Sequence, residues 1–121
     1  MSFKMLLKSL VESVPGSEGA VFADREGETV DFFTINDDSD HVRFVGAHQG
    51  ILLEAVRRAG QTADLGEPQY FIIHTEKTDY ITATVHDGYY LVLAIRAGAP
   101  MARANIAISD AVLKLRAEMG Y

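Results

Sequence analysis

Four histidines and a group of acidic residues are the side chains of this chain best suited to catalysis or metal binding. His41 and His48 stand seven residues apart, a spacing that places both on one face of a helix, but no His-x-x-x-His or His-Glu-x-x-His pair occurs. His74 and His86 fall at a strand end and in a turn, where we expect contact with solvent. The histidines therefore predict neither a metal site nor a catalytic base.

Acidic residues cluster at Asp37, Asp38 and Asp40. Clustered carboxylates bind calcium in some proteins, but the spaced ligand pattern of an EF-hand loop is missing here. Capping of a following helix explains the cluster better, because aspartate is a preferred N-cap residue. Arg25, in a short polar connection, has the chemistry of an arginine finger, although a surface arginine is the simpler interpretation. Neither feature predicts a reaction.

The common catalytic and cofactor motifs are absent from the sequence. No Gly-x-x-x-x-Gly-Lys-Ser/Thr loop and no Gly-x-Gly-x-x-Gly turn occurs, and no serine lies in a Gly-x-Ser-x-Gly elbow. With no cysteine in the chain, disulfides and thiolate-bound zinc or iron–sulfur clusters are excluded. We therefore expect a protein that is not an enzyme and that carries neither a cofactor nor a metal.

Length and charge narrow the class of protein further. A chain of 121 residues is the size of one domain, so we expect a single domain spanning residues 1–121. The formal net charge is −6 and no basic cluster exceeds Arg57-Arg58, which argues against nucleic-acid binding. No segment approaches the roughly 20 apolar residues of a membrane span, and the N-terminus lacks a signal-peptide pattern. These features favour a cytoplasmic protein.

Three segments have the apolar periodicity of helices, namely residues 3–14, about 40–59 and 100–119. Ser2 is the expected N-cap of the first helix. Gly60 is the expected residue just beyond the second. Pro100 is placed as the first residue of the third helix, which Gly120 closes.

Five segments have the length and the β-branched or aromatic content of strands, namely residues 20–23, 29–35, 69–75, 80–85 and 89–95. Short turns, among them Asp87-Gly88, predict antiparallel hairpins between neighbouring strands. The last strand is apolar throughout, so we expect it at the centre of the sheet, covered on both faces. The predicted order is αββαβββα: an α/β (α+β) fold with a five-stranded antiparallel sheet and helices on both faces.

The chain has more apolar surface than one small domain needs to bury. Residues 70–73 begin a three-stranded meander, so they are placed at a sheet edge, which proteins usually cover or pair. The helix at about 40–59 carries a wide apolar stripe. Gly46 and Gly50 within it either allow another backbone to approach closely or simply lie over the sheet. Pairing of two copies through this edge and helix would bury both, and predicts a symmetric homodimer.

Two segments resemble the roadblock/dynein light chain family, and within it the bacterial MglB-type proteins. They are residues 14–27 (VPGSEGAVFADREG) and 88–93 (GYYLVL). The first is similar to the family's helix end, glycine-led strand and Asp-x-x-Gly turn, and the second to its central strand. The resemblance implies one roadblock-type domain, with the first and last helices on one face of the sheet and the middle helix on the other.

The resemblance also implies partners. Family members pair their third strands and middle helices into homodimers or heterodimers, and MglB-type dimers bind a small Ras-like GTPase and stimulate its nucleotide cycle without catalytic residues of their own. The implied dimer interface comprises Phe44, Gly46, Gly50, Ile51, Tyr70, Ile72 and His74. The implied partner-binding positions are His41, Arg43, Ala47, His48, Glu54, Arg57 and Arg58.

Two alternatives to a GTPase regulator stay open on the sequence. One is a scaffold subunit with no effect on nucleotide hydrolysis, for which binding would not depend on the nucleotide state. The other is a small-molecule sensor with an apolar cavity between sheet and helix, which a ligand would stabilise against heat.

Overall fold

The computed structural model describes residues 1–36 and 38–121, so Asp37, one of the clustered aspartates, lies outside the described residues. The element order is αββαβββα, as predicted. The helices are α1 (Phe3–Ser13), α2 (Ser39–Thr62) and α3 (Met101–Glu118). The strands are β1 (Ser17–Ala23), β2 (Thr29–Thr34), β3 (Tyr70–His74), β4 (Thr78–His86) and β5 (Tyr89–Arg96).

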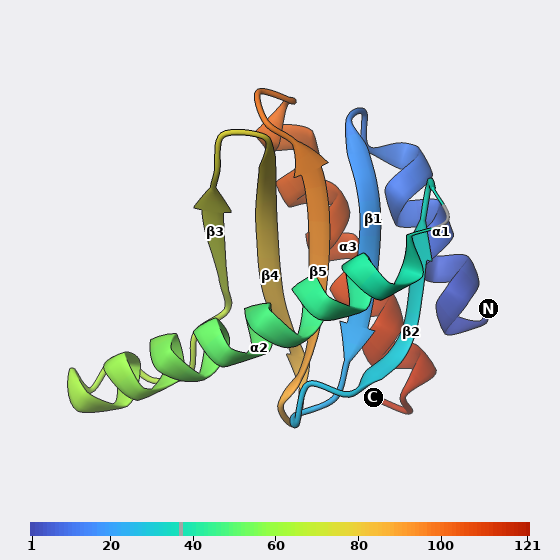
Figure 1. Cartoon of the computed structure of the whole chain (residues 1–121). Coiled ribbons are helices and arrows are strands. Elements are labelled where there is room, and N and C mark those ends of the chain that lie inside the picture. Colours follow the sequence, from blue (N-terminus) through green and yellow to red (C-terminus); the bar gives the residue numbers. More distant parts are fainter. Residues whose placement is uncertain (37) are drawn as a thin grey trace.

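The strands form one antiparallel sheet in the order β2-β1-β5-β4-β3. Figure 1 shows three layers, with α1 and α3 behind the sheet and α2 crossing its front face. The predicted fold and the predicted distribution of helices are therefore confirmed. The apolar strand β5 lies at the centre, as expected, and β2 and β3 form the two edges.

Two apolar clusters hold the layers together. The larger lies between the sheet and the helices α1 and α3, and the alternating residues Ile81, Ala83 and Val85 of β4 enter it. The smaller lies under α2. There the opposite face of β4 supplies Thr82, whose hydroxyl donates a hydrogen bond of 2.8 Å to Gln49 of α2. Helix α2 is thus held to the sheet by a smaller apolar cluster than α1 and α3 are, and by side-chain hydrogen bonds such as this one.

Helix α2 covers only part of its face of the sheet. It packs against β1 and β2 and, to a lesser extent, against β5. Its C-terminal half projects beyond the edge formed by β3 (Figure 1). As a result, the strands at that edge receive little cover from α2.

The end of α2 differs from the prediction. The helix continues through Gly60 to Thr62, and Asp64 takes the left-handed conformation, with φ 58°, that glycine usually supplies at a helix end. The amide of Asp64 donates to Gln61 O at 3.1 Å and that of Leu65 to Gly60 O at 2.7 Å. This is a Schellman motif, in which the main chain satisfies its own last carbonyls.

The other helix ends agree with the prediction except at Pro100. Ser2 caps α1, because its hydroxyl accepts a hydrogen bond from the amide of Met5 at 3.2 Å. Gly120, with φ 99°, follows α3. Pro100 is the N-cap of α3 and not its first helical residue.

Candidate partner-binding surface

Helix α2 presents an apolar outer face to solvent. Phe44 and Ile51 are 61% and 67% exposed, and Leu52 and Val56 are exposed as well. Ile51, Leu52 and Val56 follow Phe44 by seven, eight and twelve residues, and these spacings place all four on one side of the helix. Scattered exposed apolar residues are ordinary, but a row of them on one helix is typical of an interaction site. The structure thus exposes the two large apolar α2 residues of the predicted dimer interface.

Charged and aromatic side chains flank this apolar row. The rings of His48 and Phe44 stack with their centroids 4.2 Å apart, and Nδ1 of His48 lies 3.3 Å from the carbonyl oxygen of Phe44. Arg43 forms an ion pair with Asp40 at 3.2 Å. All but one of the predicted partner-binding positions are exposed on α2, namely His41, Arg43, Ala47, His48, Glu54 and Arg58.

Arg57 is the exception, and the expectation that it is exposed is wrong. It is only 8% exposed, because the position four residues after the buried Leu53 faces inward. Its Nε donates to Glu67 at 2.7 Å and its Nη1 to Glu54 at 3.0 Å. The hydrogen bond to Glu67 raises the pKa of Arg57 against the opposing effect of burial. Arg57 therefore joins α2 to the loop that leads into β3.

Gly46 and Gly50 face the sheet of their own chain and not the outer face of α2 on which we expect a second copy to pack. A Cβ atom at Gly46 would lie 2.8 Å from Val21, and one at Gly50 would lie 2.3 Å from the hydroxyl of Tyr90. The alternative, two glycines lying over the sheet, is the correct one. Their absent side chains let α2 approach closely enough for the Tyr90 hydroxyl to donate to Gly46 O at 2.8 Å.

Tyr90 is fully enclosed at this contact between α2 and the sheet. Burial, and secondarily the negative charge of Asp24, raise the pKa of Tyr90 to about 12. The phenol therefore stays protonated and remains a hydrogen-bond donor to the helix at neutral pH. Together with the Gln49–Thr82 hydrogen bond, it fixes the position of α2 over the sheet.

Strand β3 offers an open edge next to α2. The amide of Thr84 donates to Gln69 O at 2.9 Å and that of Thr75 donates to Thr78 O at 3.2 Å. In an antiparallel pair such bonded positions alternate, so residues 69, 71, 73 and 75 turn their main-chain groups toward β4. The even-numbered residues turn theirs outward, and these are Tyr70, Ile72 and His74 of the predicted interface.

The side chains on β3 add two residues that the sequence reasoning missed. Phe71 is paired with Thr82, which faces α2, so Phe71 and Ile73 lie on the α2 side of the sheet, where both are half-buried. The side chain of Ile72 points the other way and packs against the larger core. The alternation of apolar and polar residues in 80–85 shows which face of that strand is buried. Combined with the hairpin pairing, it would have predicted which β3 side chains lie on each face of the sheet.

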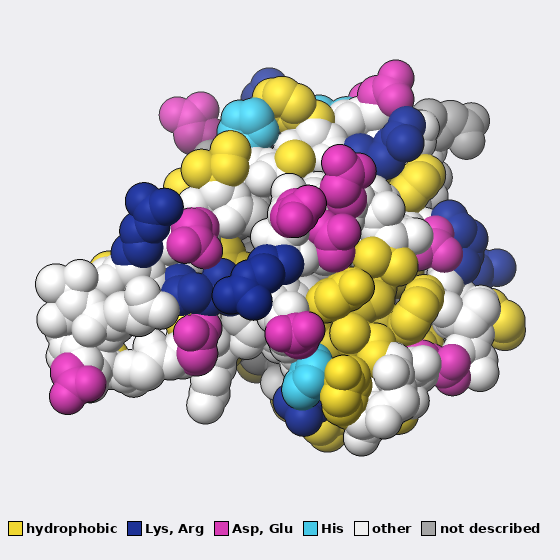
Figure 2. Space-filling view, turned by 90° about the horizontal axis from the view of Figure 1, so that it is seen from below, with side chains coloured by type: hydrophobic (Ala, Val, Ile, Leu, Met, Phe, Trp, Pro, Cys, Tyr) yellow, Lys and Arg dark blue, Asp and Glu magenta, His cyan; other side chains and the backbone are white. Residues whose placement is uncertain are grey.

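The lower end of the molecule carries charges of both signs side by side (Figure 2). Arg25 lies here at the tip of the β1–β2 hairpin, exposed and 4.0 Å from Asp87, with its stem over Gly88. This is the surface arginine of the simpler interpretation. Such mixed charge gives no basic field for a polyanion.

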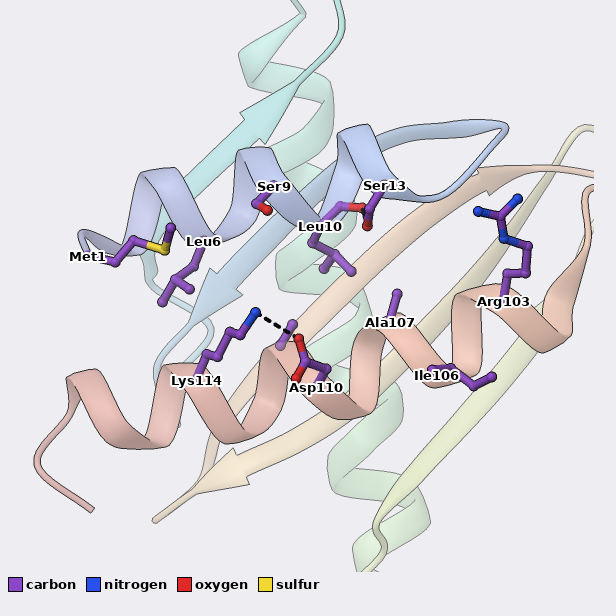
Figure 3. A pocket seen from close by; sticks show the side chains of 11 residues that line it. Met1, Leu6, Ser9, Leu10, Ser13, Arg103, Ile106, Ala107, Asp110 and Lys114 are labelled. Atoms are coloured by element: carbon purple, nitrogen blue, oxygen red, sulfur yellow. Dashed lines mark hydrogen bonds and ion pairs between the residues drawn. The ribbon is translucent and has the colours of Figure 1, made fainter.

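Two pockets on the surface are open to solvent. One, of about 450 Å³, runs between α1 and α3, where Lys114 and Asp110 form an ion pair at 2.9 Å (Figure 3). The other, of about 620 Å³, lies between α2 and the hairpin tips and is lined by Leu53 and Tyr90 among others. Neither is the enclosed apolar cavity that a small-molecule sensor would use.

Within residues 1–36 and 38–121, no group of three or more histidine, aspartate or glutamate side chains is placed to hold a metal ion. None of the helices in this described part is long and apolar enough to cross a membrane.

Solved structures show which class of fold this is. A Roadblock/LC7 domain from Streptomyces avermitilis superposes with a TM-score of 0.89 over 98% of both chains at 21% identity. MglB from Myxococcus xanthus reaches 0.87 over 98% of this chain and 94% of that one at 11% identity. MglC from the same organism reaches 0.69 over 98% and 99% at 29% identity.

The chain therefore has the Roadblock/LC7 fold. MglB and MglC of M. xanthus share this fold with it, and the resemblance drawn from the sequence is confirmed at the level of the fold. No protein-family model matches the sequence, and no curated protein sequence matches it either.

Proposed function

We propose that residues 1–121 form a single roadblock domain that acts as a non-enzymatic, dimeric regulator of a small Ras-like GTPase in a bacterial cytoplasm. The observation that carries the proposal is the outer face of α2 beside the open edge of β3. Two copies, or this chain and a related roadblock chain, would pair through these elements. No cofactor is needed for this role.

The chemistry of the surface supports pairing. Phe44, Ile51 and Val56 are costly to leave in water, at roughly 25 cal/mol for each Å² of apolar surface. An open β3 edge, which the C-terminal half of α2 passes (Figure 1), adds unpaired main-chain donors and acceptors. A second copy related by a two-fold axis would cover both features at once, because a two-fold interface is self-complementary.

The dimer would act on its GTPase by preferring one conformation of it. A partner that binds the hydrolysis-competent arrangement more tightly shifts the population toward it and needs no catalytic group of its own. The flanking positions His41, Arg43, His48, Glu54 and Arg58 would supply the polar contacts. Arg57 is left out of this set because Glu54 and Glu67 already engage it.

The pairing is tested by solution mass. Ile51→Asp places a charge in the proposed interface, and Ile106→Asp places the same charge on α3, where Ile106 is 74% exposed on the other side of the sheet. We expect light scattering to give a two-copy mass for the wild type and for Ile106→Asp, and a one-copy mass for Ile51→Asp. A one-copy wild type at all concentrations, alone and with related roadblock chains, would contradict the pairing.

The partner is tested with purified small GTPases of the same organism. We expect one of them to hydrolyse GTP faster with the wild type and with Ile106→Asp, and at its own rate with Ile51→Asp. Stable binding that leaves hydrolysis unchanged and ignores the nucleotide state would instead assign the scaffold role. Absence of binding to every such GTPase would reject the proposal.

A further inference from the structure

The two edges of the sheet are not equivalent. Ile35 donates its amide hydrogen to Glu18 O at 3.1 Å, so the odd-numbered residues of β2 pair with β1. Phe32, an even-numbered residue, turns its N–H and C=O away from the sheet. On an unprotected edge these groups would be free to pair with another strand, as the corresponding groups of β3 are.

Both outward groups of Phe32 are occupied by side chains of the same chain. The carboxylate of Asp31 accepts the Phe32 N–H at 2.8 Å. Lys4 donates from its ammonium to the Phe32 carbonyl oxygen. The same ammonium lies 3.0 Å from the Asp31 carboxylate, which joins the two groups into one cluster.

Lys4 also blocks the edge by its position. It belongs to α1 on one face of the sheet, whereas Phe32 packs in the cluster under α2 on the other face. The Lys4 ammonium nevertheless lies 4.3 Å from the centroid of the Phe32 ring. Its stem must therefore pass around the outside of β2, across the space that an added strand would occupy.

We infer that Lys4, with Asp31, closes the β2 edge against pairing with another copy of this chain. Charged side chains, lysine above all, are a common means of blocking an edge strand. If β2 were open while β3 is already paired, each pair of copies would carry two free β2 edges, and β2-to-β2 contacts between pairs would let the assembly grow. The closed edge makes assembly stop at the pair formed through β3. The statement that assembly stops at two copies rests on the proposed function, whereas the closure of the β2 edge does not.

The test removes the block and measures mass. Lys4→Ala shortens the side chain, Lys4→Arg keeps a cation that donates hydrogen bonds, and Lys8→Ala removes the same charge from an exposed position one turn along α1. We expect Lys4→Ala to form species larger than the wild type, with a mass that grows with concentration. Lys4→Arg and Lys8→Ala are expected to match the wild type.

A double variant separates this inference from the proposed dimer. In Lys4→Ala/Ile51→Asp the charge on α2 prevents the pair formed through α2 and β3, so a β2-to-β2 contact is the expected association, and we expect a mass of two copies. A one-copy wild type would reject the proposed dimer, yet Lys4→Ala would still double its mass if the inference holds.

The inference is overturned if Lys4→Ala keeps the wild-type mass at every concentration while its circular dichroism shows it folded. Asp31→Ala provides the second variant should Lys4→Ala fail to fold. It removes both the acceptor of the Phe32 N–H and the counter-charge of Lys4, and is expected to increase the mass in the same way. A folded Asp31→Ala of wild-type mass would equally reject the inference.

Discussion

A single buried phenol links α2 to the sheet, and its ionisation makes the stability of the fold depend on pH. The pKa of Tyr90 is about 12 in the folded chain and 10.0 in a model compound. Between these two values the folded state binds more protons than the unfolded state, so stability is complete below pH 10 and is lost as the pH rises toward 12. Two units correspond to about 3 kcal/mol.

Urea unfolding at a series of pH values measures this loss. We expect the free energy of unfolding of the wild type to fall more steeply above about pH 10 than that of Tyr90→Phe, which has no proton to lose at this position. Tyr90→Phe is also expected to be less stable at neutral pH by about 1 kcal/mol, because Gly46 O loses its donor. Parallel pH profiles for the two proteins would contradict this account.

Two adjacent arginines have different roles. Arg57 is buried and engaged by Glu54 and Glu67, whereas the Arg58 side chain is 77% exposed. We expect Arg57→Ala to lower the free energy of unfolding by about 1–3 kcal/mol through lost charged hydrogen bonds and packing. Arg58→Ala is expected to change it by less than about 0.5 kcal/mol. Equal effects in urea unfolding would show that Arg57 does not hold the loop.

At the level of the element, the end of α2 uses an aspartate where glycine is preferred. Asp64 adopts φ 58°, a conformation that costs a residue with a Cβ atom about 1 kcal/mol. Asp64→Gly is therefore expected to raise the melting temperature by about 4 °C in calorimetry. Gly60→Ala is the contrasting change, because its Cβ would lie 2.8 Å from Gly66 O and should lower stability. A lower melting temperature for Asp64→Gly would contradict the strain.

Periodicity predicted every helix and strand of the fold, but it did not fix where α2 ends. Gly60 resembles a terminator in sequence, whereas the helix stops only where the main chain can close its last hydrogen bonds, at Asp64. The apolar outer face of α2 was predictable from Phe44 and Ile51. The inward orientation of Gly46, Gly50 and Arg57 was not, because it depends on which side of the helix meets Tyr90 and the loop before β3.

At the level of the whole molecule, the position of each strand in the sheet predicts how well its amides are protected from hydrogen exchange. Strand β5 lies at the centre of the sheet and is buried along most of its length, whereas β3 has one neighbouring strand. In a non-associating background such as Ile51→Asp, we expect hydrogen exchange to be slow in β5 and fast at Tyr70, Ile72 and His74. In the wild type these three amides should slow with rising concentration, and Phe71 and Ile73 should change less. Uniform slowing along β3 would contradict edge pairing.

The ion pair between the amine of Met1 and the carboxylate of Glu118 brings residue 1 close to the end of α3. The Met1 nitrogen and Glu118 Oε1 are 2.9 Å apart, and Glu118 stands three residues before Tyr121. A short linker between residues 1 and 121 would therefore close this domain into a ring without rearranging any layer. Cutting that ring in the exposed 63–67 segment would yield a circular permutant that starts just before β3. In that permutant the strand at the open edge becomes the leading segment of the chain, tethered on one side only.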